Sequence, residues 1–247
     1  MTDIAVMQPT FLPWLGYLDL VDRVDTFVLL DDVQFVRRSW QHRNRVAGDP
    51  EPRWLSVPVR STGRDETTIE SAELSEPSIA DRHEGILRSA YRDAPAWDAR
   101  SSTLLELIRE GTGRDRLGDC NATILDGLAS EVGIETPMVR SSSLGRRSTD
   151  RVQHLVDLVA ALDGVRYVSV TGSADYLLPE RSRFADAGID VAFHDYEHPV
   201  YDQGDRAFTS HLSVVDALLQ VTDDVGDLIR SGRRALRRAD ELASVSP

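Results

Sequence analysis

The sequence predicts an α/β fold: a mostly parallel sheet flanked by helices, with a helical insertion in the middle of the chain. Three observations lead to this prediction. Short apolar runs alternate with stretches of helical periodicity near both ends of the chain, whereas residues 77–133 carry helical patterns alone. The 247 residues are 41% hydrophobic, which suffices for one sizeable core or two small ones. We therefore expect a single α/β domain over residues 1–232, with the insertion at about 77–133, and a charged C-terminal tail over 233–247.

The first thirty residues have the pattern of a βαβ unit. Residues 4–7 are a short apolar run that ends at Gln8-Pro9, as a buried strand would. Residues 13–24 place apolar side chains at near-helical spacing behind Pro13, which suits a first helical turn. Residues 26–30 form a second β-rich run. Strand, helix and strand within about thirty residues are typical of two parallel strands joined by a helix.

The rest of the chain is assigned in the same way. Pro58 places a further strand candidate, residues 54–59, at an edge or an end of a sheet. Asp150 is the expected N-cap of the most regular helix, and residues 61–67 are expected to form a mobile loop. The other expected helices cover 77–91, 97–110, 120–132, 150–162, a short segment ending at 187, 211–219 and 224–229, and the other expected strands cover 137–140, 166–170 and 189–193.

Composition excludes several classes of function. The chain has 28 basic and 41 acidic residues, a net charge of −13, and every basic residue is arginine. Acidic residues without lysine suit a surface hydrated at high salt, so a halophilic source or a high-GC genome is expected. Such a charge argues against nucleic-acid binding. The single cysteine fits a reducing compartment, and no run of ~18 apolar residues predicts a membrane span. A cytoplasmic protein is therefore expected, with the basic cluster at 233–238 as a solvated face or tail.

Two predicted strand ends carry polar residues where ligands bind in open α/β sheets. Gln8 begins a proline-containing turn that leads into a helix, whose free amide groups and dipole favour an anion. Asp31 and Asp32 end the second strand. Adjacent carboxylates there can act as a general base, hold a cation, or pair with Arg37 and Arg43. In the last case they would only fix the loop.

A third polar and aromatic cluster follows the predicted strand at 189–193. His194 and His198 are four residues apart with carboxylates between them, a spacing that suggests zinc, but Pro199 disfavours a helix there. No metal ligands are assigned. His198 is better suited to hydrogen bonding or acid–base chemistry, because histidine titrates near neutral pH. Ser141–Ser143 are read as a polar turn that a sugar hydroxyl could contact.

These segments resemble the WbqC-like family over nearly the whole chain. The resemblance is carried, in order and spacing, by residues 4–46, WLSVPV, RHEGILRSAYRDAPAW, GIETPMVRSSSL, RYVSVTGSADYL, GIDVAFHDYEHPVYDQ and LSVVDALL. The resemblance implies a role in surface-polysaccharide or O-antigen-type glycan biosynthesis, with acyl or aminoacyl transfer to an amino sugar as an attractive activity. TFLPWLGYLDLVDRV also resembles the opening of phosphopantetheine adenylyltransferase-type nucleotidylyltransferases, with Gly16-Tyr17 in place of their Gly-His pair.

The residues that match the family motifs at strand ends are the candidate site residues. The expected catalytic residues are Asp32, His198 and Asp31, and the expected substrate-binding residues are Gln8, Tyr17, Gln34, Arg43, Asn44, His83, Tyr176, Tyr201 and Gln203. Three hypotheses follow: a transferase acting on a nucleotide-activated amino sugar, a degenerate nucleotidylyltransferase-like protein that binds ATP, or a noncatalytic partner of a glycan-assembly enzyme. The expected ligand is a small molecule such as a nucleotide sugar or an acyl donor, and the sequence assigns neither cofactor nor oligomeric state.

Overall fold

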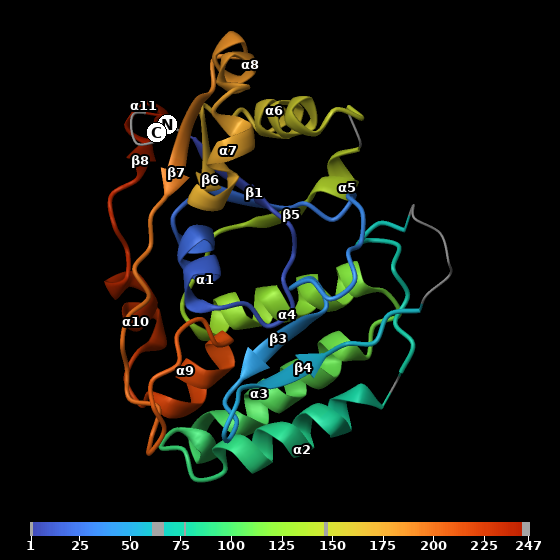
Figure 1. The fold of residues 1–247 in the computed structure, drawn as a ribbon. Coiled ribbons are helices and arrows are strands. Elements are labelled where there is room, and N and C mark those ends of the chain that lie inside the picture. The colour runs from blue at the N-terminus through green and yellow to red at the C-terminus, as the bar shows by residue number, and fades with distance from the viewer. Residues whose placement is uncertain (1, 61–66, 77, 146–147, 244–247) are drawn as a thin grey trace.

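A six-stranded sheet forms the centre of the computed structural model, in the order β5-β2-β1-β6-β7-β8 (Figure 1). The structure describes residues 2–60, 67–76, 78–145 and 148–243. Neighbouring strands pair in parallel except β8, which lies antiparallel on the edge strand β7. The strands are β1 (Asp3–Met7), β2 (Thr26–Leu29), β5 (Met138–Arg140), β6 (Arg166–Val170), β7 (Asp190–His194) and β8 (Arg237–Arg238). The predicted α/β class and the parallel sheet are thus confirmed.

Both faces of the sheet are buried, which explains why its strands are short apolar runs rather than alternating ones. Along β1, Ile4 and Val6 face one hydrophobic core and Ala5 faces the other. In β2, Val28 joins the first of these cores and Phe27 joins the second. Successive side chains on a strand point to opposite faces, so each strand contributes to two cores.

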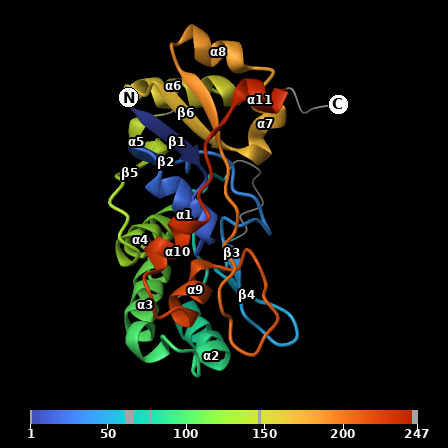
Figure 2. The ribbon, with the colours of Figure 1, turned by 90° about the vertical axis from the view of Figure 1, so that its left-hand side faces the viewer.

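Different helices cover the two faces. The core that contains Ile4 is closed by α6 (Arg151–Ala161) and α8 (Arg181–Asp186). The core that contains Phe27 is closed by α1 (Leu15–Asp22), α9 (Val214–Gln220), α10 (Val225–Ser231) and the helical insertion. The insertion consists of α2 (Ile79–Tyr91), α3 (Trp97–Thr112) and α4 (Leu117–Glu131), which lie below the sheet in Figure 1 and Figure 2. None of the helices in the described ranges is long and apolar enough to span a membrane.

The strand expected at 54–59 forms, but in a different place. It is β4 (Arg53–Ser56), which pairs with the unpredicted strand β3 (Arg43–Val46) in a separate two-stranded sheet. Strand β3 was not predicted because it lacks an alternation of polar and apolar residues. One of its buried positions is occupied by the polar Asn44. The loop expected at 61–67 falls almost entirely outside the described residues.

Residues 233–243 do not extend as the expected charged tail. Arg237–Arg238 form β8, and Ala239–Ala243 form the short helix α11. Arg233 pairs with the buried Asp19 and with Asp22 on α1, so the start of the basic cluster is held to the domain by ion pairs, whereas the side chain of Arg238 is mostly exposed.

Candidate functional site

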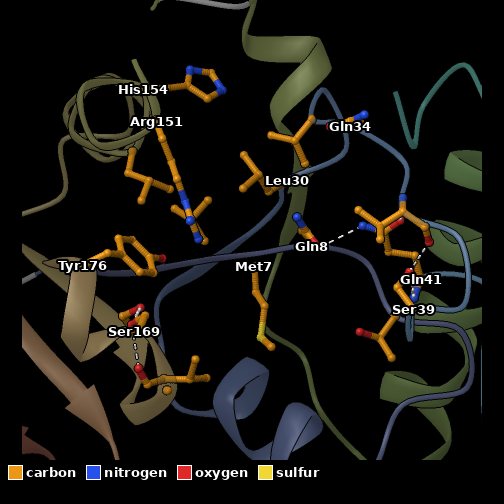
Figure 3. Close-up of a pocket in the computed structure, with 18 of the residues that line it drawn as sticks. Met7, Gln8, Leu30, Gln34, Ser39, Gln41, Arg151, His154, Ser169 and Tyr176 are labelled. Atoms are coloured by element: carbon orange, nitrogen blue, oxygen red, sulfur yellow. Dashed lines mark hydrogen bonds between the residues drawn. The ribbon is translucent and has the colours of Figure 1, made fainter. Parts of the chain in front are cut away.

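A cavity of about 590 Å³ opens at the carboxyl ends of β1, β2 and β6 (Figure 3). The chain enters β2 on one side of β1 and, after the insertion and β5, enters β6 on the other side. Ligands of open α/β sheets bind at such a switch in strand order. The walls come from the strand ends, from residues 30–41 after β2, from the start of α6, and from η1 (Thr171–Ser173) and α7 (Ala174–Leu177).

Asp32 and His154 form a pair at the wall of the cavity. Nε2 of His154 lies 2.9 Å from Oδ2 of Asp32, and Ser141 donates its hydroxyl hydrogen to Oδ1 of Asp32 at 2.6 Å. His154 lines the cavity from α6 and is only 5% exposed. Among the described residues neither of its ring nitrogens has a well-aligned hydrogen bond, so the short contact between Nε2 and Asp32 is a close electrostatic contact. Burial alone would raise the pKa of Asp32, but the contacts with His154 and Ser141 lower it below its ordinary value. Asp32 is therefore ionised beside the imidazole at neutral pH.

Asp31, the other expected catalytic carboxylate, turns away into a structural network. It is 1% exposed and forms an ion pair with Arg140, the last residue of β5. Ser142 donates to it from its main-chain N–H at 3.0 Å and from its hydroxyl at 3.1 Å, at the start of α5 (Ser141–Leu144). The residues expected as a polar turn are thus this helical turn, which holds both aspartates. Asp31 supports the site rather than facing the cavity.

Two glutamines shape the wall opposite α6. Gln8, at the end of β1, and Gln34 both line the cavity, and Gln34 also forms a β-bridge with Thr68. The buried Gln41 donates from Nε2 to Oε1 of Gln8 at 2.9 Å. Asn121, from α4, donates to the main-chain oxygen of Gln41 at 2.8 Å, so the helical insertion braces this wall.

Arg151 is the cationic side chain that stands in the cavity. Its Cζ lies 3.8 Å from the ring centre of Tyr176, another wall residue, which orients the guanidinium by a cation–π contact. Among the described residues, Arg151 forms no ion pair with a carboxylate, as Asp150 pairs with Arg183 and caps α6 through the N–H of Gln153. The predicted N-cap is thereby confirmed.

Several other expected binding residues hold the chain in place. Tyr17 is buried and donates to the main-chain oxygen of Gln8 at 3.2 Å. Asn44 donates to the main-chain oxygens of Phe11 and Leu12, and so braces a turn in which Leu12 has the left-handed φ of 46°. Arg43 stacks on Trp54 at 4.2 Å. Tyr17 and Asn44 therefore support the loop that carries Gln8 without reaching the cavity.

The expected anion site at the start of α1 is covered. Trp14 precedes the helix, and its ring lies so close to Gly16 that a Cβ there would be 2.2 Å from it. The same ring stacks on His198 and packs at a tilt against His211. The amide groups of this first turn are therefore enclosed by aromatic side chains and do not open into the cavity.

A buried hydrogen-bond cluster contains the motif residues from the C-terminal third of the chain. Tyr91 and Tyr201 each donate to Asp216 at 2.8 Å, and Tyr91 accepts from the N–H of Ala47. Gln203 exchanges two hydrogen bonds with Thr209 and so closes a loop. Burial raises the pKa of Asp216. The cluster joins the end of α2, the residue that follows β3, and α9.

His198 and His194 lie outside the cavity. His198 packs among Trp14, Tyr201, Phe208 and His211 and shares no contact with Asp32, so the structure does not bring these two expected catalytic residues together. His194 lies 2.7 Å from the buried Asp19. In the described ranges, no group of three or more His, Cys, Asp or Glu side chains is arranged to hold a metal ion.

The sequence missed His154, Arg151 and Gln41 as site residues. His154 and Arg151 were assigned only to a regular helix, in which His154 occupies the buried face. A usable signal existed: a helix that follows a strand end often starts beside the ligand, and both residues lie within its first four positions. Gln41 had no such signal, because its role depends on folding back against Gln8.

His83 predicts a specific pH dependence of stability. It is 1% exposed, its Nε2 lies 3.1 Å from the main-chain oxygen of Ser56, and burial lowers its pKa from 6.5 to about 4. Between these two pH values the unfolded chain binds a proton that the folded protein does not. We therefore expect the free energy of unfolding to fall by up to about 3 kcal/mol as pH is lowered through this window.

Urea unfolding of the wild type and of His83→Gln at several pH values measures this effect. Glutamine removes the titrating group, so the variant should lack this part of the pH dependence. The other histidines act equally in both proteins. Parallel curves for the two proteins would contradict a buried neutral His83.

Comparison with known proteins gives matches that extend over nearly the whole chain. A sequence model of the family described as the WbqC-like protein family matches residues 8–227. A protein of Mycobacterium tuberculosis, named "Uncharacterized protein Rv1507c", is 29% identical over 237 residues, which cover 95% of this chain and 100% of the relative. No solved structure matches this chain. The family match includes every described residue from Gln8 to Tyr176 that lines the cavity.

Proposed function

The chain belongs to the WbqC-like protein family, and we propose that it is a transferase acting on a nucleotide-activated amino sugar in surface-polysaccharide biosynthesis. The transferred group is an acyl or aminoacyl group. The glycan pathway and the transfer of an acyl or aminoacyl group are both suggested by the family resemblance, and the chemistry of the cavity is compatible with them. A volume of about 590 Å³ lies in the ~300–1,000 Å³ range of small-molecule sites.

The Asp32–His154 pair supports this proposal most directly. Transfer of an acyl group to an amine needs a base. The amine attacks only in its neutral form, and its nitrogen must lose a further proton when the new bond forms. A buried imidazole held by an ionised carboxylate is suited to that task. In the proposed step the amine nitrogen bonds to the acyl carbon, its proton passes to the imidazole of His154, and the leaving group departs from the donor with the electron pair of the bond that breaks. Asp32 stabilises the resulting imidazolium.

A binding and turnover screen tests the proposal. The purified protein, kept in high salt, is heated with nucleotide sugars, ATP with magnesium, and acyl or aminoacyl donors. A ligand that binds only the folded state adds about 2.7 kcal/mol of stability at a hundredfold excess over its Kd. We expect an amino-sugar nucleotide to raise the melting temperature. After a donor is added, we expect the mass of the sugar to increase by that of the transferred group.

Two outcomes would replace the proposal. Magnesium-dependent ATP binding with release of pyrophosphate would favour the nucleotidylyltransferase-like alternative. Binding of an amino-sugar nucleotide with no turnover for any donor would leave a sugar-binding protein rather than a transferase.

A further inference from the structure

The orientation of the Gln8 amide is fixed by a chain of hydrogen bonds. The main-chain N–H of Val36 donates to Oε1 of Gln41 at 2.8 Å. An N–H can only donate, so the other end of the Gln41 amide is its NH₂ group, which donates to Oε1 of Gln8 at 2.9 Å. The NH₂ group of Gln8 is then left as a donor. The chain of bonds therefore decides which end of Gln8 is presented to the cavity.

This relay is rigid because its middle member is enclosed. Gln41 is 3% exposed, and Asn121 holds its main-chain oxygen from α4. Rotating the Gln41 amide would place its NH₂ group against the N–H of Val36 and leave both buried donors unsatisfied. Each unsatisfied donor lowers the population of the rotated state by several-fold or more.

A second donor group enters the cavity from the opposite wall. Arg151 lies on the Tyr176 ring and forms no ion pair with any described carboxylate. Figure 3 shows Arg151 and Gln8 reaching from two sides toward the space beside Met7 and Leu30. The chain as a whole carries a net charge of −13, so an unneutralised guanidinium in its cavity marks a place where an anion is attracted.

We propose that Gln8 and Arg151 form a subsite for an oxyanion of the substrate, a phosphate or a carboxylate group. Arginine binds both groups through paired N–H donors, and the Gln8 amide adds a neutral donor. The inference rests on the proposed function insofar as the cavity is the substrate site, and it names the charged part of that substrate. Gln41 is a positioning residue, since it acts through Gln8.

Isothermal titration of the full chain with five probes tests the charge of the ligand. The probes are pyrophosphate, N-acetylglucosamine 1-phosphate, UDP-N-acetylglucosamine, glucuronate and uncharged N-acetylglucosamine. We expect binding of anionic probes and at least tenfold weaker binding of the neutral sugar. The two phosphorylated sugars against glucuronate distinguish a phosphate from a carboxylate source. Failure of all four anionic probes to bind at millimolar concentration would overturn the subsite.

Arg151→Met keeps an apolar side chain on the ring of Tyr176 but removes the charge. We expect it to lower the affinity for the anionic probes about tenfold or more. Arg181→Met on α8 is the matched control, because it removes the same charge from an exposed residue that does not line the cavity. Equal affinity of the Arg151 variant and the wild type would overturn the proposal. Equal losses in both variants would do the same, because they would reduce it to an effect of net charge.

Gln41→Glu tests the relay. A carboxylate at 41 can accept from Val36 but cannot donate to Gln8, so the Gln8 amide should turn and present its oxygen to the cavity. We expect anion affinity to fall about tenfold or more, although Gln8 and Arg151 are both intact. Gln41→Met removes the relay without adding charge and should cost only a few-fold. Unchanged affinity in a folded Gln41→Glu protein would contradict the relay.

Binding and turnover can fail separately in these experiments. Anion binding that depends on Arg151, without transfer of any group, would leave the subsite standing and reject the transferase. Group transfer that is unchanged by substitution of Arg151 or Gln41 would support the transferase and reject the anion subsite.

Discussion

Replacement of His154 by glutamine is expected to lower turnover by about 10²–10⁴-fold, the usual contribution of a general base. Substrate binding should change little, because the amide fills a similar volume and the proposed anion donors lie elsewhere. The fall would therefore be in kcat rather than in KM. Steady-state kinetics with the amino-sugar nucleotide found in the screen measure both parameters.

Asp32→Asn tests the other half of the pair. The carboxylate orients the imidazole and stabilises its protonated form, and the pKa of Asp32 is lowered, so this support is present across neutral pH. An asparagine removes the negative charge and can place an NH₂ group against Nε2 of His154. We expect a loss of turnover similar in size to that of His154→Gln, and a double variant no worse than either single one, because the two residues act as a unit.

Asp157→Asn is the matched control for both variants. It lies one turn further along α6, where it accepts a hydrogen bond from Gln153 and does not line the cavity. Its turnover should equal that of the wild type. If His154→Gln kept full turnover while His198→Gln lost it, the base would lie in the aromatic cluster around Trp14 instead, and the assignment to α6 would be wrong.

Hydrophobic periodicity was sufficient to predict the five parallel strands of the sheet, although not the short antiparallel strand β8. The runs at 4–7, 26–30 and 166–170 are buried on both faces, and apolar runs bounded by turn residues indicate that situation without any knowledge of pairing. The rule that ligands bind at carboxyl ends of parallel strands then pointed to Gln8 and Asp32. Both lie at or beside the cavity.

Pairings over long sequence distances could not be predicted. Asp31 and Asp32 are adjacent in the sequence with no local feature that separates them, yet Asp31 pairs with Arg140 and Asp32 lies against His154. Which of the two lies beside the cavity depends on how β5 and α6 pack against β2. That packing joins residues more than 100 positions apart, so no local pattern encodes it.

The histidines show the same limit. His198 stands in a loop dense in polar and aromatic residues, which favours a functional reading, but its neighbours fold into an aromatic cluster. His154 stands in a regular helical pattern, which favours a packing role, but α6 sets it against a buried carboxylate. Local composition distinguishes loops from cores, whereas the partner of a titratable group depends on tertiary contacts.

Asp31→Ala is expected to lower the free energy of unfolding by about 3–5 kcal/mol, the cost of breaking a buried ion pair. Removal of the carboxylate leaves Arg140 without its buried partner and leaves the N–H and hydroxyl donors of Ser142 unsatisfied. Urea unfolding at neutral pH measures the change. Asp119→Ala is the matched control: it removes the other partner of Arg140, but its side chain is 43% exposed, so its loss should cost less than ~1 kcal/mol.

The difference between these two variants decides what Asp31 does. A large loss of stability for Asp31→Ala, with part of the turnover retained per folded molecule, would make it a residue that anchors β5 and α5 to the end of β2. Turnover would survive only in part, because Ser141, which this network positions, also holds Asp32 at 2.6 Å. Loss of turnover with unchanged stability would instead make Asp31 a second carboxylate of the reaction. The burial of its side chain and the three donor groups that Arg140 and Ser142 direct at it favour the first outcome, since the Asp31 carboxylate is bonded within the fold and does not line the cavity.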